Sequence, residues 1–279
     1  MLNMHTQNLP TYIKQYLENL NLTAPIGSFA LVEQLQQQHL ATYSFSSINA
    51  MQGAYLPIDA ESLFDRLITK RQGGYCFEHN RIMYLVLEAL GYDVKLALAR
   101  VMLNGRADNP RTHRVTLLNF AQKTYTVEVG FGVKAPIMPI EINRNQVVIE
   151  GVNQYQVLCS EGFATISQIA PETISLYQID LAEVFEGDCE VGHFYSHQHF
   201  EAAFVNNLVV SRIEGGQRYL IRNDSFIHTN EQTGVQTQQT IHDISQLKNL
   251  LSKYMGVQAS DAYLSHAFDK VQTRIAQKS

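Results

Sequence analysis

Apolar side chains recur every three or four positions through the first ninety residues, a spacing typical of amphipathic helices. Helices are predicted at residues 11–20 and 29–40, after Asp59, and over the apolar run that ends at Gly91. Asp59 is suited to accept hydrogen bonds from the first turn of the third helix, and Gly91 is suited to end the fourth helix in a left-handed conformation. The N-terminal third of the chain is therefore predicted to be helical.

The hydrophobic pattern changes to alternation after residue 93, which is typical of half-buried strands. Strands are predicted at residues 94–103, 113–119 and 124–129, the last two as a hairpin, with further short strands to about residue 180. Gly215-Gly216 predicts a second hairpin. Two helices close the chain, at residues 245–254 and 261–277. The pattern predicts an α+β fold with three domains, at residues 1–92, 93–205 and 206–279.

The composition indicates a folded protein with a large core. Of 279 residues, 45% are apolar and 17% are charged, so long disordered tails are not expected. The net charge is −5 and the chain has no basic run, which argues against nucleic-acid binding. No N-terminal signal pattern and no run of about eighteen apolar residues is present. We therefore expect a cytoplasmic protein that binds neither nucleic acid nor membrane.

The three cysteines are too few and too widely spaced for a disulfide framework or a zinc ribbon. Cys159 lies in a strand-like apolar stretch and is expected to be a buried small side chain. Cys189 has acidic neighbours, which are expected to raise the pKa of its thiol and make it a poor nucleophile. Cys76 is therefore the candidate for a reactive thiol.

Cys76 follows Gly73-Gly74-Tyr75 and precedes the apolar run of the fourth predicted helix. At the first turn of a helix, the dipole and the free N–H groups favour a thiolate. Paired glycines just upstream let another group approach the sulfur closely. This setting is typical of a nucleophile, although a cysteine beside glycines also occurs as a plain structural residue.

His113 and Glu128 are the candidate base and orienting group, since a thiol nucleophile needs both. His113 opens one strand of the predicted hairpin and Glu128 closes the other, so the two are expected at neighbouring positions of its open end. Glu128 is also a charged residue within an apolar run, and a buried charged side chain needs a partner. With Cys76 on the other side of the imidazole, the three residues form a triad. Taken singly, each residue also fits a structural role.

The segment Gly73-Gly74-Tyr75-Cys76-Phe77-Glu78 resembles the signature of the arylamine N-acetyltransferases, in which a Gly-Gly-aromatic-Cys-x-Glu motif carries the acyl-accepting cysteine. Thr112-His113-Arg114 resembles the segment that supplies this family's histidine, and residues 127–132 resemble its Asp-Val-Gly-Phe-Gly segment. The segment around Phe45 resembles the family's Pro-Phe-Glu-Asn region. Residues 188–204 resemble a later segment whose final phenylalanine lines the acceptor pocket. The resemblance is collinear over nearly the whole chain.

This resemblance implies a cysteine-protease-like fold with an N-terminal helical bundle, a central β-barrel and a C-terminal α/β lid. It implies ping-pong acetyl transfer from acetyl-CoA to arylamines or arylhydrazines, with Cys76 as acyl carrier, His113 as base and Glu128 as orienting group. It implies acetyl-CoA as a co-substrate, with no tightly bound cofactor and no metal. Substrate contacts are expected from Phe45, Thr112, Gly130, Phe131 and Phe204.

Four features depart from the family pattern. Glu128 stands where the family usually has an aspartate, so its carboxylate is one methylene longer. Gln72 stands where an arginine usually precedes the two glycines, and Ser46-Ser47 replace the Glu-Asn pair. Val133 follows Gly132 where a further glycine is common. These changes bear on the acyl donor and the rate more than on the fold.

Three other functions stay open at this point. The same thiol chemistry serves a hydrolase or a transglutaminase-like enzyme, and it serves an amide synthase that closes a macrolactam. A weakly active relative that only binds small aromatic molecules or CoA is the third. A metal site at His193, His197 and His199 is not expected, because no glutamate follows His193 as the zinc-protease pattern requires.

Overall fold

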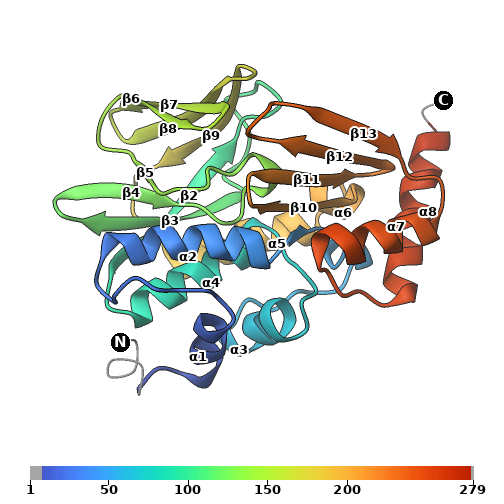
Figure 1. Ribbon diagram of the computed structural model, residues 1–279, viewed down its shortest axis with the longest axis horizontal. Coiled ribbons are helices and arrows are strands. Elements are labelled where there is room, and N and C mark those ends of the chain that lie inside the picture. The colour runs from blue at the N-terminus through green and yellow to red at the C-terminus, as the bar shows by residue number, and fades with distance from the viewer. Residues whose placement is uncertain (1–7, 278–279) are drawn as a thin grey trace.

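The computed structural model describes residues 8–277, in which helices cover and flank two antiparallel sheets (Figure 1). The helices are α1 (Thr11–Glu18), α2 (Phe29–Thr42), α3 (Ala60–Leu63), α4 (Cys76–Ala89), α5 (Glu186–Gln198), α6 (Ala203–Asn206), α7 (Ile244–Leu250) and α8 (Asp261–Ala276). Short 3-10 turns form η2 (Ala50–Gln52) and η4 (Gly132–Lys134), and wider π turns form η3 (Phe64–Thr69) and η5 (Leu251–Met255).

The larger sheet has eight strands and curves into a barrel-like body (Figure 1). Its strands, in spatial order, are β5 (Ile140–Glu141), β4 (Lys123–Val127), β3 (His113–Phe120), β2 (Asp93–Val101), β9 (Ile174–Asp180), β8 (Phe163–Ala170), β7 (Asn153–Ser160) and β6 (Gln146–Glu150). Small and β-branched side chains such as Ala99, Val115 and Ile166 fill its interior. These residue types suit the half-buried face of a twisted sheet.

The smaller sheet joins the two ends of the chain. Its strands, in spatial order, are β1 (Phe45–Ser46), β10 (Val209–Glu214), β11 (Gln217–Arg222), β12 (Ser225–Asn230) and β13 (Gln236–Thr240). The helices α7 and α8 pack their apolar sides against it. In the pairing of β1 with β10, Phe45 lies opposite Ser211, and Phe45 also bridges to Gly74. A segment between the N-terminal helices therefore links the C-terminal sheet to the loop before Cys76.

The N-terminal helices form their own apolar core around α2 and α4, and the predicted helix starts are confirmed. The Asp59 carboxylate accepts a hydrogen bond from the Ser62 N–H at 2.9 Å and caps α3, as predicted. Gly91 has a φ of +83° directly after α4, the left-handed conformation expected of a terminating glycine. Local sequence signals therefore placed these ends correctly.

Two features differ from the sequence prediction. The strand β4 ends at Val127, so Glu128 lies one residue beyond the hairpin rather than closing it. The helix α5 was not predicted, because the side that it buries carries small and polar residues rather than a hydrophobic stripe. The predicted fold class is confirmed, whereas the predicted domain boundaries stay predictions. None of the helices in residues 8–277 combines the length and apolar character needed to cross a bilayer.

Candidate active site

Cys76 is the first residue of α4, and the loop before it is held by a buried ion pair. The Glu78 carboxylate accepts a hydrogen bond from the Tyr75 N–H at 3.0 Å, which satisfies one free donor at the helix start. Arg66 donates to the same carboxylate through Nη2 at 2.6 Å and Nε at 3.2 Å. Its Nη2 also donates to the Pro57 carbonyl at 2.9 Å. These contacts fix the backbone from which the thiol projects.

The two glycines upstream of Cys76 are required by the packing of this loop. A Cβ on Gly73 would lie 2.5 Å from the Cβ of Ser46, and the residue has a φ of +71°. A Cβ on Gly74 would lie 2.7 Å from a methyl group of Leu67. The Ser46 N–H donates to the Gly74 carbonyl at 2.5 Å. The glycines therefore let residues 73–75, which we call the nucleophile loop, lie directly against β1.

His113 and Glu128 form a buried pair beside Cys76. His113 Nε2 lies 2.7 Å from Glu128 Oε2, and each residue is 1% exposed. Because Nε2 faces the carboxylate, Nδ1 is the nitrogen that remains for the thiol. Burial alone would lower the pKa of His113, but the Glu128 carboxylate and the hydrogen bond to Cys76 outweigh it and raise that pKa to about 10. Cys76 Sγ also lies 3.6 Å from the Thr112 carbonyl oxygen.

Asn80 connects the Glu128 carboxylate to the helix of the cysteine. Its Nδ2 donates to Glu128 Oε1 at 2.8 Å and to the Arg114 carbonyl at 2.6 Å. Its Oδ1 accepts from the Val129 N–H at 3.0 Å. Asn80 is fully buried, so these bonds are shielded from water. The position of the carboxylate is therefore set from α4 as well as from the end of β4.

Gly130 lies where the backbone after Glu128 crosses the start of α4. Its N–H donates to Glu128 Oε1 at 2.6 Å, which completes the contacts of that oxygen. A Cβ at Gly130 would lie 2.7 Å from the Cα of Cys76 and 3.0 Å from the Cys76 carbonyl oxygen. Both are backbone atoms, so moving them aside would cost considerable free energy. The absence of a side chain at Gly130 lets the two segments touch.

The expected substrate-contacting aromatic residues lie in two groups around Cys76, His113 and Glu128. The Phe204 ring lies 5.3 Å from that of Phe45 and 5.2 Å from that of Tyr75. The Phe131 ring lies 5.2 Å from the His113 ring and 4.8 Å from that of Tyr177. The structure thus brings all the predicted site residues into one region. Tyr177 was not expected there.

His193 and His197 hold α5 against the nucleophile loop through hydrogen bonds, and they do not form a metal-binding cluster. The Tyr75 hydroxyl lies 2.5 Å from His193 Nδ1, and His193 Nε2 donates to the Leu56 carbonyl at 2.6 Å. His197 Nδ1 lies 2.6 Å from the His193 carbonyl oxygen. Burial lowers the pKa of His193 to about 3, so it is neutral near pH 7. Within residues 8–277, no group of three possible metal ligands is present.

The other two cysteines correct two sequence expectations. Burial raises the pKa of the Cys189 thiol to about 11, and the acidic neighbours expected to cause this shift contribute less. Cys159 is half-buried on β7 rather than buried, and its Sγ lies 3.0 Å from the Ile142 carbonyl oxygen. Burial raises the pKa of this thiol as well. Among residues 8–277, neither cysteine has a histidine partner like that of Cys76.

Sequence reasoning missed Asn80, Arg66 and Tyr177. Asn80 follows Cys76 by four residues, so the helical repeat placed both on one face of α4 and offered a signal. Arg66 lies on the preceding π turn and reaches Glu78 from there. Arg71 instead stacks over the Tyr43 ring at 5.4 Å. Nothing in the sequence around Tyr177 marks its contact with His113.

Comparison with known proteins gives consistent results. A sequence profile of the N-acetyltransferase family matches residues 28–263. The arylamine N-acetyltransferase of Escherichia coli is 29% identical over 261 residues, which cover 92% of each chain. The arylamine N-acetyltransferase / N-hydroxyarylamine O-acetyltransferase of Salmonella typhimurium is 26% identical, over 95% of this chain and 94% of the relative.

Solved structures show the same fold. The Salmonella typhimurium arylamine N-acetyltransferase has a TM-score of 0.86 at 22% identity and covers 94% of this chain and 99% of its own. The Mycobacterium marinum arylamine N-acetyltransferase in complex with CoA has a TM-score of 0.86 at 24% identity, over 93% of this chain and 99% of its own. Because the family profile spans far more than half of the sequence, the chain belongs to the arylamine N-acetyltransferase family.

Proposed function

We propose that this protein moves an acetyl group from acetyl-CoA to the nitrogen of arylamines or arylhydrazines, by a ping-pong mechanism through acetyl-Cys76. The observation that carries the proposal is the contact of His113 with Glu128 on one side and Cys76 on the other, at the start of α4. Relatives named arylamine N-acetyltransferases and a relative bound to CoA support the substrate classes. Acetyl-CoA is a co-substrate here, not a resident cofactor.

In the first half-reaction, Cys76 accepts the acetyl group. With a pKa of about 10, His113 holds a proton at neutral pH. The nucleophilic form of a cysteine is its thiolate, so the reaction starts from the Cys76 thiolate beside the His113 imidazolium. The thiolate attacks the thioester carbonyl and forms a carbon–sulfur bond. The intermediate collapses, the bond to the CoA sulfur breaks, and CoA leaves with the proton from His113. The product is acetyl-Cys76 with a neutral His113.

In the second half-reaction, the acceptor nitrogen attacks the acetyl carbonyl of Cys76. His113 removes the proton from the nitrogen as the carbon–nitrogen bond forms. The carbon–sulfur bond then breaks, which regenerates the thiolate beside an imidazolium. The N-acetylated amine leaves, so atoms and charges balance over the cycle.

Glu128 and the start of α4 stabilise the charges that develop in both steps. The Glu128 carboxylate keeps the ring of His113 in one orientation and stabilises its protonated form. The backbone N–H of Cys76 lies at the first turn of α4, where N–H groups have no partner within the helix, and it is our candidate donor to the oxyanion. Cys76 is 3% exposed, so little water competes for these contacts.

The residues predicted to contact the substrates differ in the kind of group that they offer. Phe45 and Phe204 offer flat apolar surface for an aromatic amine. Phe131 packs against His113 and shapes the site beside the base. Thr112 and Gly130 contribute backbone groups next to Cys76, since the Thr112 carbonyl faces Sγ and Gly130 touches the Cys76 backbone.

The test is mass spectrometry of the intact protein after a brief exposure to acetyl-CoA without an acceptor. One acetyl group should appear, map to Cys76, and be absent in Cys76→Ala. Addition of aniline should then remove the label and yield acetanilide. Labelling of Cys159 or Cys189 instead would contradict the proposal. Loss of the label to water at the same rate with and without aniline would indicate a hydrolase.

A further inference from the structure

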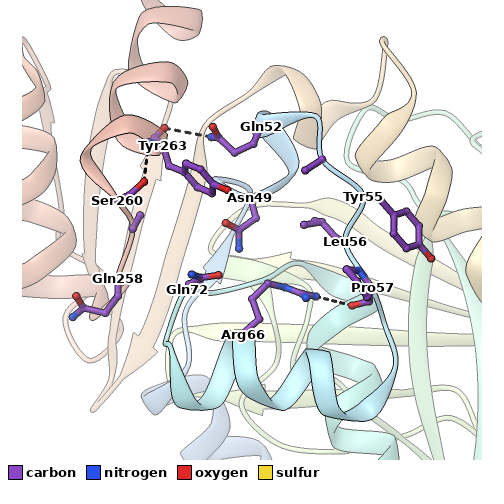
Figure 2. Close-up of a pocket in the computed structure, with 12 residues that line it drawn as sticks. Asn49, Gln52, Tyr55, Leu56, Pro57, Arg66, Gln72, Gln258, Ser260 and Tyr263 are labelled. Atoms are coloured by element: carbon purple, nitrogen blue, oxygen red, sulfur yellow. Dashed lines mark hydrogen bonds between the residues drawn. The ribbon is translucent and has the colours of Figure 1, made fainter.

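A cavity of about 430 Å³ opens beside Gln72, the residue that precedes the nucleophile loop (Figure 2). Its walls come from three distant parts of the chain: the segment around η2, the π turn η3 with Gln72, and the residues that lead into α8. Cys76, His113 and Glu128 do not line it, and neither do Phe45 or Phe204. The cavity is therefore separate from the site described above.

The walls carry polar groups that bind nothing else in the described chain. Asn49 is 6% exposed, and its Nδ2 is buried without a hydrogen-bond partner among residues 8–277. The side-chain amides of Gln72 and Gln258 form no hydrogen bond within the same residues. Gln52 donates its amide hydrogens to two carbonyls, which leaves its Oε1 to accept. Gln72 is half-buried and Gln258 is exposed, whereas Asn49 is buried, and buried amides normally find partners.

These unpaired groups are uncharged. Within the part of the chain that the structure describes, the single cation in the walls is Arg66, and its guanidinium is already bonded to the Glu78 carboxylate at 2.6 Å. No carboxylate of the described residues lines the cavity, so neither an anion nor a cation finds a free counter-charge among them. Tyr263 lies beside Asn49 and is 40% exposed, so it offers a ring face and a hydroxyl (Figure 2). Tyr55 is 60% exposed, and its ring lies 5.5 Å from that of His197 on α5.

We propose that this cavity binds a neutral, polyhydroxylated molecule of the size of a mono- or disaccharide. Carboxamides and hydroxyls both donate and accept hydrogen bonds, which matches the dual character of sugar hydroxyls. The volume lies within the range of roughly 300–1,000 Å³ that is typical of small-molecule sites. The accessible amides of Gln72 and Gln258 gain from such a ligand the partners that the protein does not supply. This binding function goes beyond the proposed acetyl transfer.

The test measures saturation transfer from the protein to dissolved sugars by NMR, with glucose and maltose as probes. Protonated glucosamine and glucuronate share the ring and differ in charge. Transfer should be seen for glucose and maltose and be several-fold weaker for both charged sugars. Transfer should fall several-fold in Gln72→Leu and in Tyr263→Ala, and the second variant changes an exposed residue, so it leaves the core intact.

Two control variants locate the binding. Gln239→Leu replaces an exposed glutamine on β13 that does not line the cavity, and it should keep full transfer. Cys76→Ala should also keep it, which separates this proposal from the acetyl-transfer mechanism. The proposal is overturned if the natural protein gives no transfer to either neutral sugar. It is equally overturned if glucuronate or glucosamine gives the stronger signal, or if both cavity variants bind as well as the natural protein.

Discussion

Asn80 donates a hydrogen bond to Glu128 at 2.8 Å, from the same helix face that begins with Cys76. The two residues are 48 positions apart in the chain, and both are buried. One side chain on α4 thus fixes the carboxylate that orients His113. Asn80 is a positioning residue, because it acts on the reacting groups through Glu128.

Asn80→Asp keeps the size of the side chain and replaces its donor by a charged oxygen. The new carboxylate repels that of Glu128, so the rate of acyl-enzyme formation should fall by about 100-fold, as small misplacements at reactive sites do. A pure loss of stability would not alter the pH profile of the remaining activity, whereas this change should shift it. The matched control is Asn119→Asp, because Asn119 makes the same kind of bond to Asp93 at 3.0 Å near the surface. An unchanged rate in Asn80→Asp would rule out the positioning role.

Glu128→Gln removes the charge that stabilises the His113 imidazolium and should reduce the rate of acyl-enzyme formation by about 10⁴-fold. Glu128→Asp should also be less active than the natural protein. Its shorter side chain cannot reach His113, Asn80 and the Gly130 N–H together, and a shift of about 1 Å costs roughly 100-fold. Stopped-flow measurement of the reaction with acetyl-CoA gives the rate of acyl-enzyme formation for both variants. Near-full activity in Glu128→Gln would show that another group orients His113.

Gly130→Ala should destabilise the protein by about 3 kcal/mol and abolish acetylation, because the new Cβ meets the backbone of Cys76 at 2.7 Å. Gly187→Ala is the matched control. A Cβ at Gly187 meets nothing within 4 Å, and the residue lies in the first turn of α5, so this change should stabilise by up to about 1 kcal/mol. Urea unfolding of both variants provides the comparison. Similar stabilities would mean that the contact between Gly130 and Cys76 is not tight.

The His113–Glu128 pair should make stability fall as pH rises. The folded pKa of His113 is about 10, above the ordinary value of 6.5, so the folded state keeps a proton that the unfolded chain releases between these values. Below about pH 6.5 this pair makes its whole contribution to the free energy of unfolding, and that contribution is lost as the pH rises towards 10. Glu128→Gln should lack most of this slope in urea unfolding. Parallel pH profiles for the two proteins would contradict the raised pKa.

His193 should produce the opposite slope on the acid side. Its folded pKa is about 3, below the ordinary 6.5, so the unfolded chain binds a proton that the folded state rejects. Stability should therefore fall as pH drops from about 6.5 towards 3. His193→Gln should flatten this part of the profile, and His242→Gln, at an exposed position, should not. Acid sensitivity that persists in His193→Gln would have to come from other groups.

Much of the N-terminal architecture could be predicted from the sequence, because helix starts and ends depend on neighbouring residues. Asp59 bonds to Ser62 three positions away, and Gly91 takes the conformation that ends α4. Cys76 was recognised by its own motif, and its place at a helix start needed only the residues around it. His113 and Glu128 followed from a hairpin whose strands are adjacent in the chain.

The helix α5 shows where pattern reading fails. Its residues Val191, Phe194 and Tyr195 are exposed, whereas Gly192 and His193 are buried against the nucleophile loop. The hydrophobic pattern thus indicates the wrong face. Only the hydrogen bonds of His193 to Tyr75 and Leu56 explain why a polar side is buried, and these partners lie more than 110 positions away.

The sequence by itself therefore determined the family, the local ends of the helices and the identity of the thiol, because these depend on short-range chemistry. The tertiary structure alone decided that Asn80 holds Glu128, that Arg66 braces Glu78, and that distant amides surround one cavity. Each of these contacts joins residues with no fixed spacing in the chain. Their formation depends on how the helices and the two sheets pack, and periodicity along a sequence carries no record of that packing.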